Sequence, residues 1–512
     1  MAQAHDLVPV TRRVLADQLT PVLAYRRLVS GDTRLAPSFL LESVEVGGTV
    51  GRYSVIGARP SQTVTVHGHN TEHHDAAGDV LQAGVCDDPL DSVRSVLADA
   101  TIAPSPGPWF PGGWCGWIGY DAVRWLEPDA VGFDRAPVDD RGIADMHLGL
   151  YLEVLVFDHV DKTLTAVRWA DRAAASSAKA AEQDAMDRLD ILIDRVESDA
   201  VALPPGRLDL DPSAMGTRPG TCNMTQAQFE QGVERCIDYI RAGDIFQVVP
   251  SQRFEREVEV DPFAVYRTLR VVNPSPYMIY MQGPGAILIA SSPEILCRVD
   301  DRTVFSRPLA GTRRRGADEK ADAALEVDLR TDKKECAEHS MLVDLARNDI
   351  GTVCEPGTVE VERLMDVERY RHVMHLSSTI KGTLREGLDA WDALRRSLPV
   401  GTVSGAPKIR AMQIIDELEP TRRGPFGGGI GCVSLHGNMD MAIALRTMVV
   451  PTPRRGPPWT YHLQAGAGIV LDSVPQREYE ETIAKAASLS RAIDLAESAF
   501  AAEPSGGHGE PR

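Results

Sequence analysis

A chain of 512 residues is too long to fold around one ordinary hydrophobic core, so we expect two large domains or one interleaved pair of domains. Its composition, 43% hydrophobic and 25% charged, is typical of a soluble globular protein. The net charge of −19 argues against a general binder of nucleic acid or of anionic membranes, because both require a basic surface.

The eight cysteines are dispersed, with no Cys-x-x-Cys pair, which predicts reduced thiols rather than a disulfide framework or a zinc site. The N-terminal residues lack the basic and apolar pattern of a secretory signal. No apolar run approaches the roughly 18 residues that a membrane span requires. We therefore expect a cytoplasmic protein with no membrane partner.

Taken in chain order, the N-terminal residues predict a helix and then strands. Residues 10–18 have the mixed pattern of one helix. Residues 39–60 hold two apolar runs around Gly-Gly and predict a β-hairpin, and residues 63–68 alternate as a strand. The Gly-, Pro- and Trp-rich segment 104–125 predicts an irregular loop leading into a helix. Residues 148–158 predict one strand, paired with residues 163–169.

Further along, residues 172–197 are strongly helix-forming. The Pro- and Gly-rich residues 202–221 predict a boundary, so we divide the chain into domains 1–215 and 222–495, with a disordered tail at 503–512. Thr225 is a predicted N-cap, and Gly243 follows the last apolar position of the helix between them. The remainder alternates strands and helices and ends in one long helix.

Two pairs of glutamates, each three residues apart, distinguish the C-terminal half. Glu335 and Glu338 lie in one predicted helix and Glu478 and Glu481 begin another, so both carboxylates of a pair project from one helix face. Two such pairs facing each other would enclose a hard cation, and oxygen ligands are what Mg²⁺ prefers. Any single Glu is more often a solvated surface charge. Because the first helix continues into apolar residues 342–346, we expect a metal site.

Three glycine-rich loops lie in the same half, at residues 401–405, 425–431 and 464–470. The first precedes a predicted helix start, where backbone N–H groups bind anions. Turn geometry is the usual explanation of one such loop. Three loops beside several Arg and Lys favour a site for a small anion. No Walker loop and no dinucleotide fingerprint occurs, so a nucleotide is not favoured.

Residues 225–495 closely resemble a known family, the chorismate-utilising enzymes, and the chain as a whole resembles the anthranilate synthase large subunits of that family. The matching segments are IRAGDIFQVVPSQRF, NPSPYM, SSPEILCRV, RPLAGTRRRG, KKECAEHSMLVDLARND, VMHLSSTIKG, GTVSGAPKIRAM and QAGAGIVLDSVPQREYEET. The resemblance implies an α+β fold in which twisted antiparallel sheets stack face to face with helices outside, built from two interleaved subdomains. Residues 1–215 would be regulatory and residues 222–495 catalytic.

The resemblance also implies a reaction and its residues. Chorismate and ammonia would yield anthranilate and pyruvate, the first committed step of tryptophan biosynthesis. Mg²⁺ would be held by Glu338 and Glu481, with Glu335 and Glu478 beside them, some through water, and would hold the ring carboxylate of chorismate. The remaining substrate contacts would be Thr312, Arg446, Gly466, Gly468, Lys485 and Phe426, where the family often has Tyr in place of Phe426.

Four further positions match catalytic ones. His375 matches the family's catalytic histidine, although a lone His is more often structural. Glu294 matches the acid that protonates the departing C4 hydroxyl, a role that requires a raised pKa. Thr402 matches a threonine that contacts substrate or product. Gln247 stands where isochorismate and salicylate synthases carry a water-activating Lys.

Two of the residues separate the related reactions. Gln247 cannot act as a base, which fits a nucleophile that arrives ready to react, namely ammonia. Aminodeoxychorismate synthase carries a nucleophilic Lys where this chain has Ala310. Both residues therefore favour anthranilate over aminodeoxychorismate or isochorismate and salicylate, which remain the alternatives within the family. A catalytically silent tryptophan sensor is the alternative outside it.

The resemblance implies two kinds of partner. No Cys-His-Glu glutaminase set is recognisable, so ammonia would come from a separate glutamine amidotransferase subunit in an expected heterotetramer. Two segments resemble those that bind tryptophan as feedback inhibitor, although an ordinary strand and turn is the other explanation. Their residues are Glu42, Ser43, Asn273, Pro274, Ser275, Tyr277 and Met278.

Overall fold

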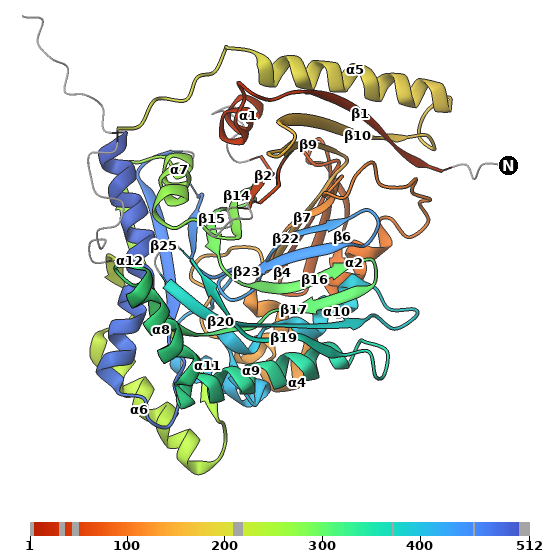
Figure 1. Ribbon diagram of the computed structural model, residues 1–512. Coiled ribbons are helices and arrows are strands. Elements are labelled where there is room, and N and C mark those ends of the chain that lie inside the picture. Colours follow the sequence, from red (N-terminus) through yellow and green to blue (C-terminus); the bar gives the residue numbers. More distant parts are fainter. Residues whose placement is uncertain are drawn as a thin grey trace, which may run out of the picture.

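Two large antiparallel sheets dominate the computed structural model, which describes residues 5–29, 36–43, 51–207, 219–370, 373–453 and 456–500 (Figure 1). The first sheet runs in the order β1 (Leu7–Leu15), β10 (Thr163–Asp171), β9 (Glu153–Asp158), β3 (Tyr53–Ala58), β2 (Ser38–Glu42), β14 (Tyr277–Gly283), β15 (Ala286–Ser292), β24 (Thr447–Pro451), β25 (Trp459–Gly466), β13 (Ser251–Val258) and β11 (Thr221–Cys222).

The second sheet has a similar extent. Its order is β18 (Leu309–Arg314), β20 (Val373–Thr383), β17 (Thr303–Ser306), β16 (Ile295–Asp300), β23 (Met439–Ile443), β22 (Gly429–Ser434), β7 (Gly113–Ile118), β8 (Met146–Tyr151), β4 (Gln62–His67), β5 (Asn70–Asp75) and β6 (Val80–Val85), with β19 (Glu360–Arg369) also paired to β20. A short ribbon joins β12 (Gln247–Val248) to β21 (Gly405–Ala406).

Both halves of the chain build both sheets. In the first sheet β2 pairs with β14, with Leu41 opposite Ile279, and in the second β22 pairs with β7, with Ile430 opposite Trp117. The predicted α+β fold with interleaved halves is therefore confirmed. The boundary between residues 1–215 and 222–495 stays a prediction. Residues 208–218 beside that boundary, and the predicted tail at 503–512, lie outside the described residues.

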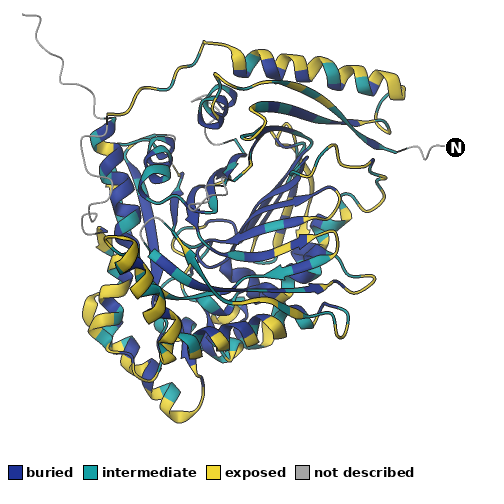
Figure 2. Ribbon diagram, in the orientation of Figure 1, coloured by how far each residue is buried: buried dark blue, intermediate teal, exposed yellow. Residues whose placement is uncertain are grey.

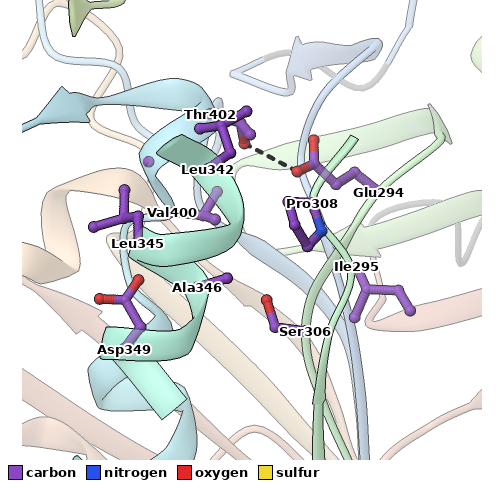
Figure 3. A pocket seen from close by; sticks show the side chains of 11 residues that line it. Glu294, Ile295, Ser306, Pro308, Leu342, Leu345, Ala346, Asp349, Val400 and Thr402 are labelled. Atoms are coloured by element: carbon purple, nitrogen blue, oxygen red, sulfur yellow. Dashed lines mark hydrogen bonds between the residues drawn. The ribbon is translucent and has the colours of Figure 1, made fainter. Parts of the chain in front are cut away.

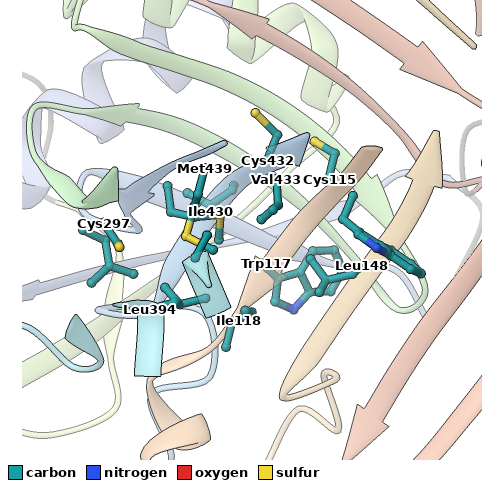
Figure 4. Close-up of a cluster of buried hydrophobic side chains, with 14 of the residues drawn as sticks. Cys115, Trp117, Ile118, Leu148, Cys297, Leu394, Ile430, Cys432, Val433 and Met439 are labelled. Carbon is teal, nitrogen blue, oxygen red and sulfur yellow. The ribbon is translucent and has the colours of Figure 1, made fainter. Parts of the chain in front are cut away.

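The first sheet is buried on both faces. Successive strand residues point to opposite faces, so neighbouring residues of one strand join different core clusters. Phe39 and Ile279 join a core cluster that includes Trp117 and other side chains of the second sheet, so this cluster lies between the sheets. Their neighbours Leu40 and Tyr280 instead join a cluster with residues of the covering helices. Figure 4 shows part of the first cluster on β7, β8 and β22. The layers are thus helices, sheet and sheet, with further helices outside.

The helices cover the outer faces (Figures 1 and 2). Helix α12 (Pro475–Ala499) packs on α7 (Pro262–Val272) and β25. Helix α5 (Ala178–Glu197) lies along β1 and β10, α9 (Lys333–Gly351) packs on β18 and β20, and α10 (Ala390–Ser397) packs on β16. No helix of the described segments is both long and apolar enough to cross a membrane. The other α-helices of the described residues are α1 (Pro21–Leu28), α2 (Pro89–Ser95), α3 (Val123–Leu126), α4 (Pro128–Val131), α6 (Gln226–Ala242), α8 (Glu319–Thr331) and α11 (Lys408–Leu418).

The sequence predicted several elements correctly. Strands β2 and β3 form the predicted hairpin, whose connection at 44–50 lies outside the described residues. Helix α6 begins after Thr225, which forms a capping box with Gln228, and ends at Gly243 with φ of 84°. This left-handed conformation favours glycine, which has no Cβ.

Three element predictions were wrong. Residues 10–18 are no helix, because residues 7–15 form strand β1, whose side chains from Val10 onward alternate between half-buried and exposed. Residues 148–158 form two strands that separate at Leu152 and enter different sheets. The segment expected as a loop contains the central strand β7, where a Cβ on Gly116 would come within 1.9 Å of the His147 carbonyl oxygen.

Candidate active site

The imidazole of His375 lies on β20, opposite Thr312 of β18. Its Nδ1 is 3.0 Å from Thr312 Oγ1 and 3.1 Å from the Gly311 carbonyl oxygen. Because a carbonyl only accepts hydrogen bonds, the neutral ring carries its proton on Nδ1, and this tautomer leaves Nε2 as a base. Burial lowers the pKa of His375 to about 4, so the ring is neutral near pH 7.

The carboxyl of Glu294 is buried just before β16 begins. Burial raises its pKa to about 8, although hydrogen bonds from the Thr402 hydroxyl and the Leu309 amide partly oppose this. The Thr402 hydroxyl donates to Glu294 Oε1 over 3.1 Å, as the dashed line in Figure 3 shows. The pair borders a cavity of about 10 Å³, lined also by α9, which has room for about one water molecule. At neutral pH this carboxyl therefore holds a proton.

Strand β18 connects the protonated acid to the neutral base. Its Leu309 amide bonds to Glu294, and Thr312, three residues further on, contacts His375. Three residues of an extended strand span at most about 10 Å. Ala310 lies between them, and its small side chain leaves this part of the site without a nucleophile.

The two glutamate pairs lie on α9 and α12, and Glu338 of the first helix is electrostatically coupled to Glu481 of the second. Burial raises the pKa of Glu338, and the neighbouring carboxylates Glu335 and Glu481 raise it further. Burial likewise raises the pKa of Glu478, as does Glu481. Glu338 and Glu481 are therefore near each other across the two helices, while the convergence of all four carboxylates stays a prediction.

All four carboxylates already have protein partners, and that of Glu478 is the Ser473 side chain. Glu338 Oε1 accepts from Gln247 Nε2 at 2.9 Å, Glu335 pairs with Arg313 at 3.1 Å, and Glu481 pairs with Lys485 at 2.7 Å. Within the described ranges, no three acidic, His or Cys side chains are grouped closely enough to hold a metal ion directly. The arrangement is therefore an acidic cluster with polar partners, and it fits a cation bound partly through water.

The predicted carboxylate-binding residues lie beside this cluster. Lys485 Nζ donates to the Gly466 carbonyl oxygen at 2.9 Å, and a Cβ on Gly468 would come within 2.9 Å of Gln247 Nε2. Arg446 has a left-handed backbone with φ of 48°, and burial lowers the pKa of its guanidinium. Within the described residues, this guanidinium makes one hydrogen bond, which Nη1 donates to Ser488 Oγ at 3.4 Å. Its other donors are available to an anion.

Phe426 is connected to the Thr402 loop through Arg423. Its ring is 3% exposed and stacks 5.7 Å from the guanidinium carbon of Arg423. Arg423 in turn donates to the carbonyl oxygen of Val403, the residue after Thr402. Phe426 therefore supports the Thr402 loop through a buried cation–π contact.

One residue of the site escaped the sequence prediction. Arg313 donates to Asp328, Asp332 and Glu335 at 2.6, 2.7 and 3.1 Å, and so joins β18 to helices α8 and α9. Its place in the RPLAGTRRRG segment, next to Thr312, was the available signal. The three carboxylates that it contacts come from other segments, and only the tertiary structure brings them to it.

The two segments predicted to bind tryptophan are adjacent. Met278 of β14 lies opposite Glu42 of β2, and Ser43 directly follows that strand. The Glu42 carboxylate is buried and accepts from Tyr266 at 2.6 Å and from Arg270 Nη2 at 3.1 Å. Asn273, Ser275 and Tyr277 bond instead to Ser291, Ser292 and Asp440.

Comparison with known proteins agrees with this geometry. Residues 37–491 match the family of chorismate binding enzymes. The chain is 49% identical to "anthranilate synthase alpha subunit 1, chloroplastic" from Oryza sativa subsp. indica, covering 98% of this chain and 90% of the relative. It is 43% identical to anthranilate synthase component 1 from Pseudomonas aeruginosa, covering 97% of each.

Solved structures show the same fold. The crystal structure of anthranilate synthase component I from Streptococcus pneumoniae matches with a TM-score of 0.71 at 36% identity, covering 94% of this chain and 99% of the other. A menaquinone-specific isochorismate synthase from Escherichia coli, at 20% identity and a TM-score of 0.67 over 96% of each chain, shares the fold alone. The chain therefore belongs to the chorismate binding enzymes, and within them to the anthranilate synthase component I proteins.

Proposed function

We propose that this chain converts chorismate and ammonia to anthranilate and pyruvate. The observation that carries the proposal is a buried carboxyl that holds a proton, Glu294, and a neutral imidazole, His375, which contact β18 at Leu309 and Thr312 respectively. The first step forms a C–N bond at ring C2 while the C4 hydroxyl leaves, and Glu294 supplies the proton that turns this group into water. In the second step His375 Nε2 accepts the C2 proton while the C3–O bond to the enolpyruvyl group breaks, and the released enolpyruvate takes up a proton to become pyruvate.

The choice of nucleophile rests on Gln247 and Ala310. Gln247 is 3% exposed and its amide donates to Glu338, so it positions that carboxylate and cannot take a proton from water. Ala310 offers no amine for a covalent intermediate. Ammonia needs neither a base to deprotonate it nor a covalent intermediate on the protein, and this favours anthranilate over the products of the related reactions.

We also propose a Mg²⁺ site at the acidic cluster of Glu335, Glu338, Glu478 and Glu481, partly through water. A bound divalent cation supplies positive charge for an anionic substrate. Burial and the neighbouring Glu481 carboxylate raise the pKa of Glu338 and of Glu478, and a bound cation would offset both effects, which supports the site. Isothermal titration with Mg²⁺ tests it: Glu338→Gln should abolish the binding heat. Glu480→Gln, at an exposed position of α12 next to Glu481, should leave it unchanged.

The proposal includes two partners. A separate glutamine amidotransferase subunit would supply ammonia, since the relatives are named as component 1 or alpha subunit. Tryptophan would inhibit at the joined segments around Glu42 and Met278. In that case Ser43→Phe should remove inhibition while preserving activity, and equal sensitivity of the variant would refute the placement.

One assay decides the reaction. The purified chain is given chorismate, Mg²⁺ and an ammonium salt, and anthranilate is followed by its fluorescence. We expect anthranilate and pyruvate in equal amounts. Isochorismate, salicylate or an aminodeoxychorismate product would instead identify one of the related activities, and unchanged chorismate would favour a silent tryptophan sensor.

A further inference from the structure

The carboxylate of Glu368, which the proposed reaction does not use, lies on a strand next to the candidate base. Glu368 of β19 is directly opposite His375 of β20, and Thr312 of β18 is opposite His375 on the other side. Residues directly opposite in an antiparallel pair have Cβ atoms about 5 Å apart and share a face of the sheet. His375 is therefore flanked by Thr312 on one neighbouring strand and by Glu368 on the other.

Three side chains hold the Glu368 carboxylate in place. The Tyr370 hydroxyl donates to Oε2 at 2.9 Å, and Ser377 Oγ and Arg307 Nη2 both donate to Oε1. Each donor comes from a different segment: Tyr370 directly follows β19, Ser377 is on β20, and Arg307 lies between β17 and β18. The Glu368 side chain is 21% exposed, and with these three donors it has little freedom to turn.

The Tyr370 ring connects this carboxylate to the imidazole. It lies edge to face with the His375 ring, with the ring centroids 5.6 Å apart and an angle of 64° between the planes. Its hydroxyl donates to Glu368, so one side chain contacts both groups. Because Thr312 and the Gly311 carbonyl already hold Nδ1, packing of Tyr370 against the ring further restricts the direction in which Nε2 points.

The Glu368 carboxyl is ionised at neutral pH. Burial would raise its pKa, but the hydrogen bond from Ser377 and the charge of Arg307 outweigh burial and hold the pKa below its ordinary value. The Tyr370 hydrogen bond acts in the same direction. A carboxylate is therefore present on the face of the sheet that carries the imidazole.

This negative charge opposes the other influences on His375. Burial lowers the pKa of the imidazole most strongly, and the positive charges of Arg446 and Lys485 lower it further. The Gly311 carbonyl and the Glu368 carboxylate raise it. When His375 accepts a proton, the imidazolium ion would be stabilised by Glu368, because an opposite charge at short range favours the charged form.

We propose that Glu368 is a positioning residue for the base of the second step: its carboxylate orients the His375 ring through Tyr370 and stabilises the imidazolium ion that forms when Nε2 takes the C2 proton. This inference rests on the proposed function. A base that is itself oriented by a third group is a recurring catalytic arrangement. Here Nδ1 bonds to Thr312 and Gly311, so Glu368 acts through its charge and through the Tyr370 ring.

The test follows both steps in single turnovers, with the full chain in excess over chorismate and with Mg²⁺ and an ammonium salt present. Loss of chorismate measures the first step, anthranilate fluorescence measures the second, and chromatography detects the aminated ring intermediate between them. Glu368→Gln should slow anthranilate formation at least about tenfold, keep chorismate loss within about twofold and let the intermediate accumulate. An ion pair that only stabilises the fold would not separate the two steps.

Glu362→Gln is the matched control. Glu362 lies on the same strand and also pairs with a cation, Lys381 at 2.8 Å, but the residues around it are opposite Thr379 and Ile380 rather than His375. The substitution removes the same charge, and both steps should proceed as in the unsubstituted chain.

Two further variants keep the test decisive if Glu368→Gln does not fold. Tyr370→Phe keeps the ring against His375 and removes only the hydrogen bond to Glu368, so it should slow the second step about threefold and spare the first. In His375→Ala, adding Tyr370→Phe should cause no further loss, because the group through which Glu368 acts is gone. Normal second steps in Glu368→Gln and Tyr370→Phe, or equal slowing of both steps, would overturn the inference.

A spectroscopic measurement separates this inference from the proposed function. With ¹⁵N-labelled histidine, the ring nitrogen signals of His375, assigned by their loss in His375→Ala, report its tautomer at pH 7. We expect one tautomer, protonated on Nδ1, in the unsubstituted chain and in Glu362→Gln, and a mixture in Glu368→Gln. If the unsubstituted chain forms no anthranilate, the proposed function is wrong, and an unchanged tautomer in Glu368→Gln would overturn the positioning role independently.

Discussion

Glu294 and His375 acquire opposite pKa shifts from one cause. Burial penalises the charged form of each group, which is the anion for a carboxyl and the cation for an imidazole. The pKa therefore rises to about 8 in Glu294 and falls to about 4 in His375. At pH 7 an ordinary carboxylate has become an acid and an ordinary imidazole has become a base, as acid–base catalysis at neutral pH requires.

Glu294→Gln tests the acid. The amide keeps the shape and can still accept from Thr402, but it has no proton to transfer, so we expect kcat to fall by about 10²–10⁴. The wild-type rate should decline as pH rises through about 8, where the acid deprotonates, and the residual rate of the variant should not. A variant with wild-type kcat would contradict the role.

Stability provides the control for that variant. The folded pKa of about 8 lies above the ordinary 4.5, so the folded state keeps a proton that the unfolded state loses. The contribution of Glu294 to stability is therefore complete below about pH 4.5 and is lost as pH rises to about 8. Glutamine does not titrate. At pH 8 the Tm of Glu294→Gln should equal or exceed that of the wild type, which would exclude unfolding as the cause of low activity.

Gln247 determines the nucleophile at the residue scale. In Gln247→Lys an amine replaces the amide beside Glu338, and it can act as a base toward water, so we expect anthranilate formation to drop at least about tenfold and a hydroxylated product to appear. Chromatography of the products measures both. Gln247→Met has a similar length without a base and should lower the rate without forming the new product. Undiminished ammonia turnover in the Lys variant would count against this role.

At the scale of elements, β15 connects the proposed inhibitor segments to the substrate site. Ser291 Oγ accepts from Asn273 Nδ2 at 3.0 Å and donates to the Asn273 carbonyl oxygen at 2.5 Å. The Ser291 amide donates to the carbonyl oxygen of Arg446 at 3.1 Å. One residue thus contacts both regions. A displacement of Asn273 by a bound inhibitor would reach the strained Arg446 backbone through a single strand.

Ser291→Ala removes the side-chain bonds to Asn273 and keeps the amide bond to Arg446. If tryptophan acts through β15, the concentration for half inhibition should rise about fivefold or more with little change in the uninhibited rate, because a coupling energy is lost. Inhibition curves of anthranilate formation measure this. Ser61→Ala, which removes a comparable hydrogen bond to Leu150, is the control. Equal inhibition of both variants would show that the coupling takes another route.

At the scale of the whole molecule, neither half of the chain completes a sheet. Strands of residues 1–215 form one side of each sheet and strands of residues 222–495 the other, joined where β2 meets β14 and β22 meets β7. Separating the halves would expose four strand edges and both faces of the shared core.

Separately produced fragments 1–215 and 219–512 should therefore fail to fold. We expect each alone to give broad amide NMR spectra or to aggregate, and the two produced together to recover anthranilate formation. Near-UV circular dichroism and the ammonium-dependent assay measure this. A cooperative thermal transition in an isolated fragment would show instead that this half is an independent domain.

The amino-acid sequence by itself determined the local features, such as helix ends, and the chemical groups available to the site. Thr225 and Gly243 end α6 as predicted, because capping depends on residues within one turn. The spacing of Glu335 and Glu338 placed two carboxylates on one helix face, and the motifs identified the family. The tertiary structure alone decided that residues 148–158 divide between two sheets, that β7 is a central strand and that Arg313 joins the acidic cluster. Strand pairing, burial and the resulting pKa values depend on residues hundreds of positions apart, and no local pattern encodes which of them meet.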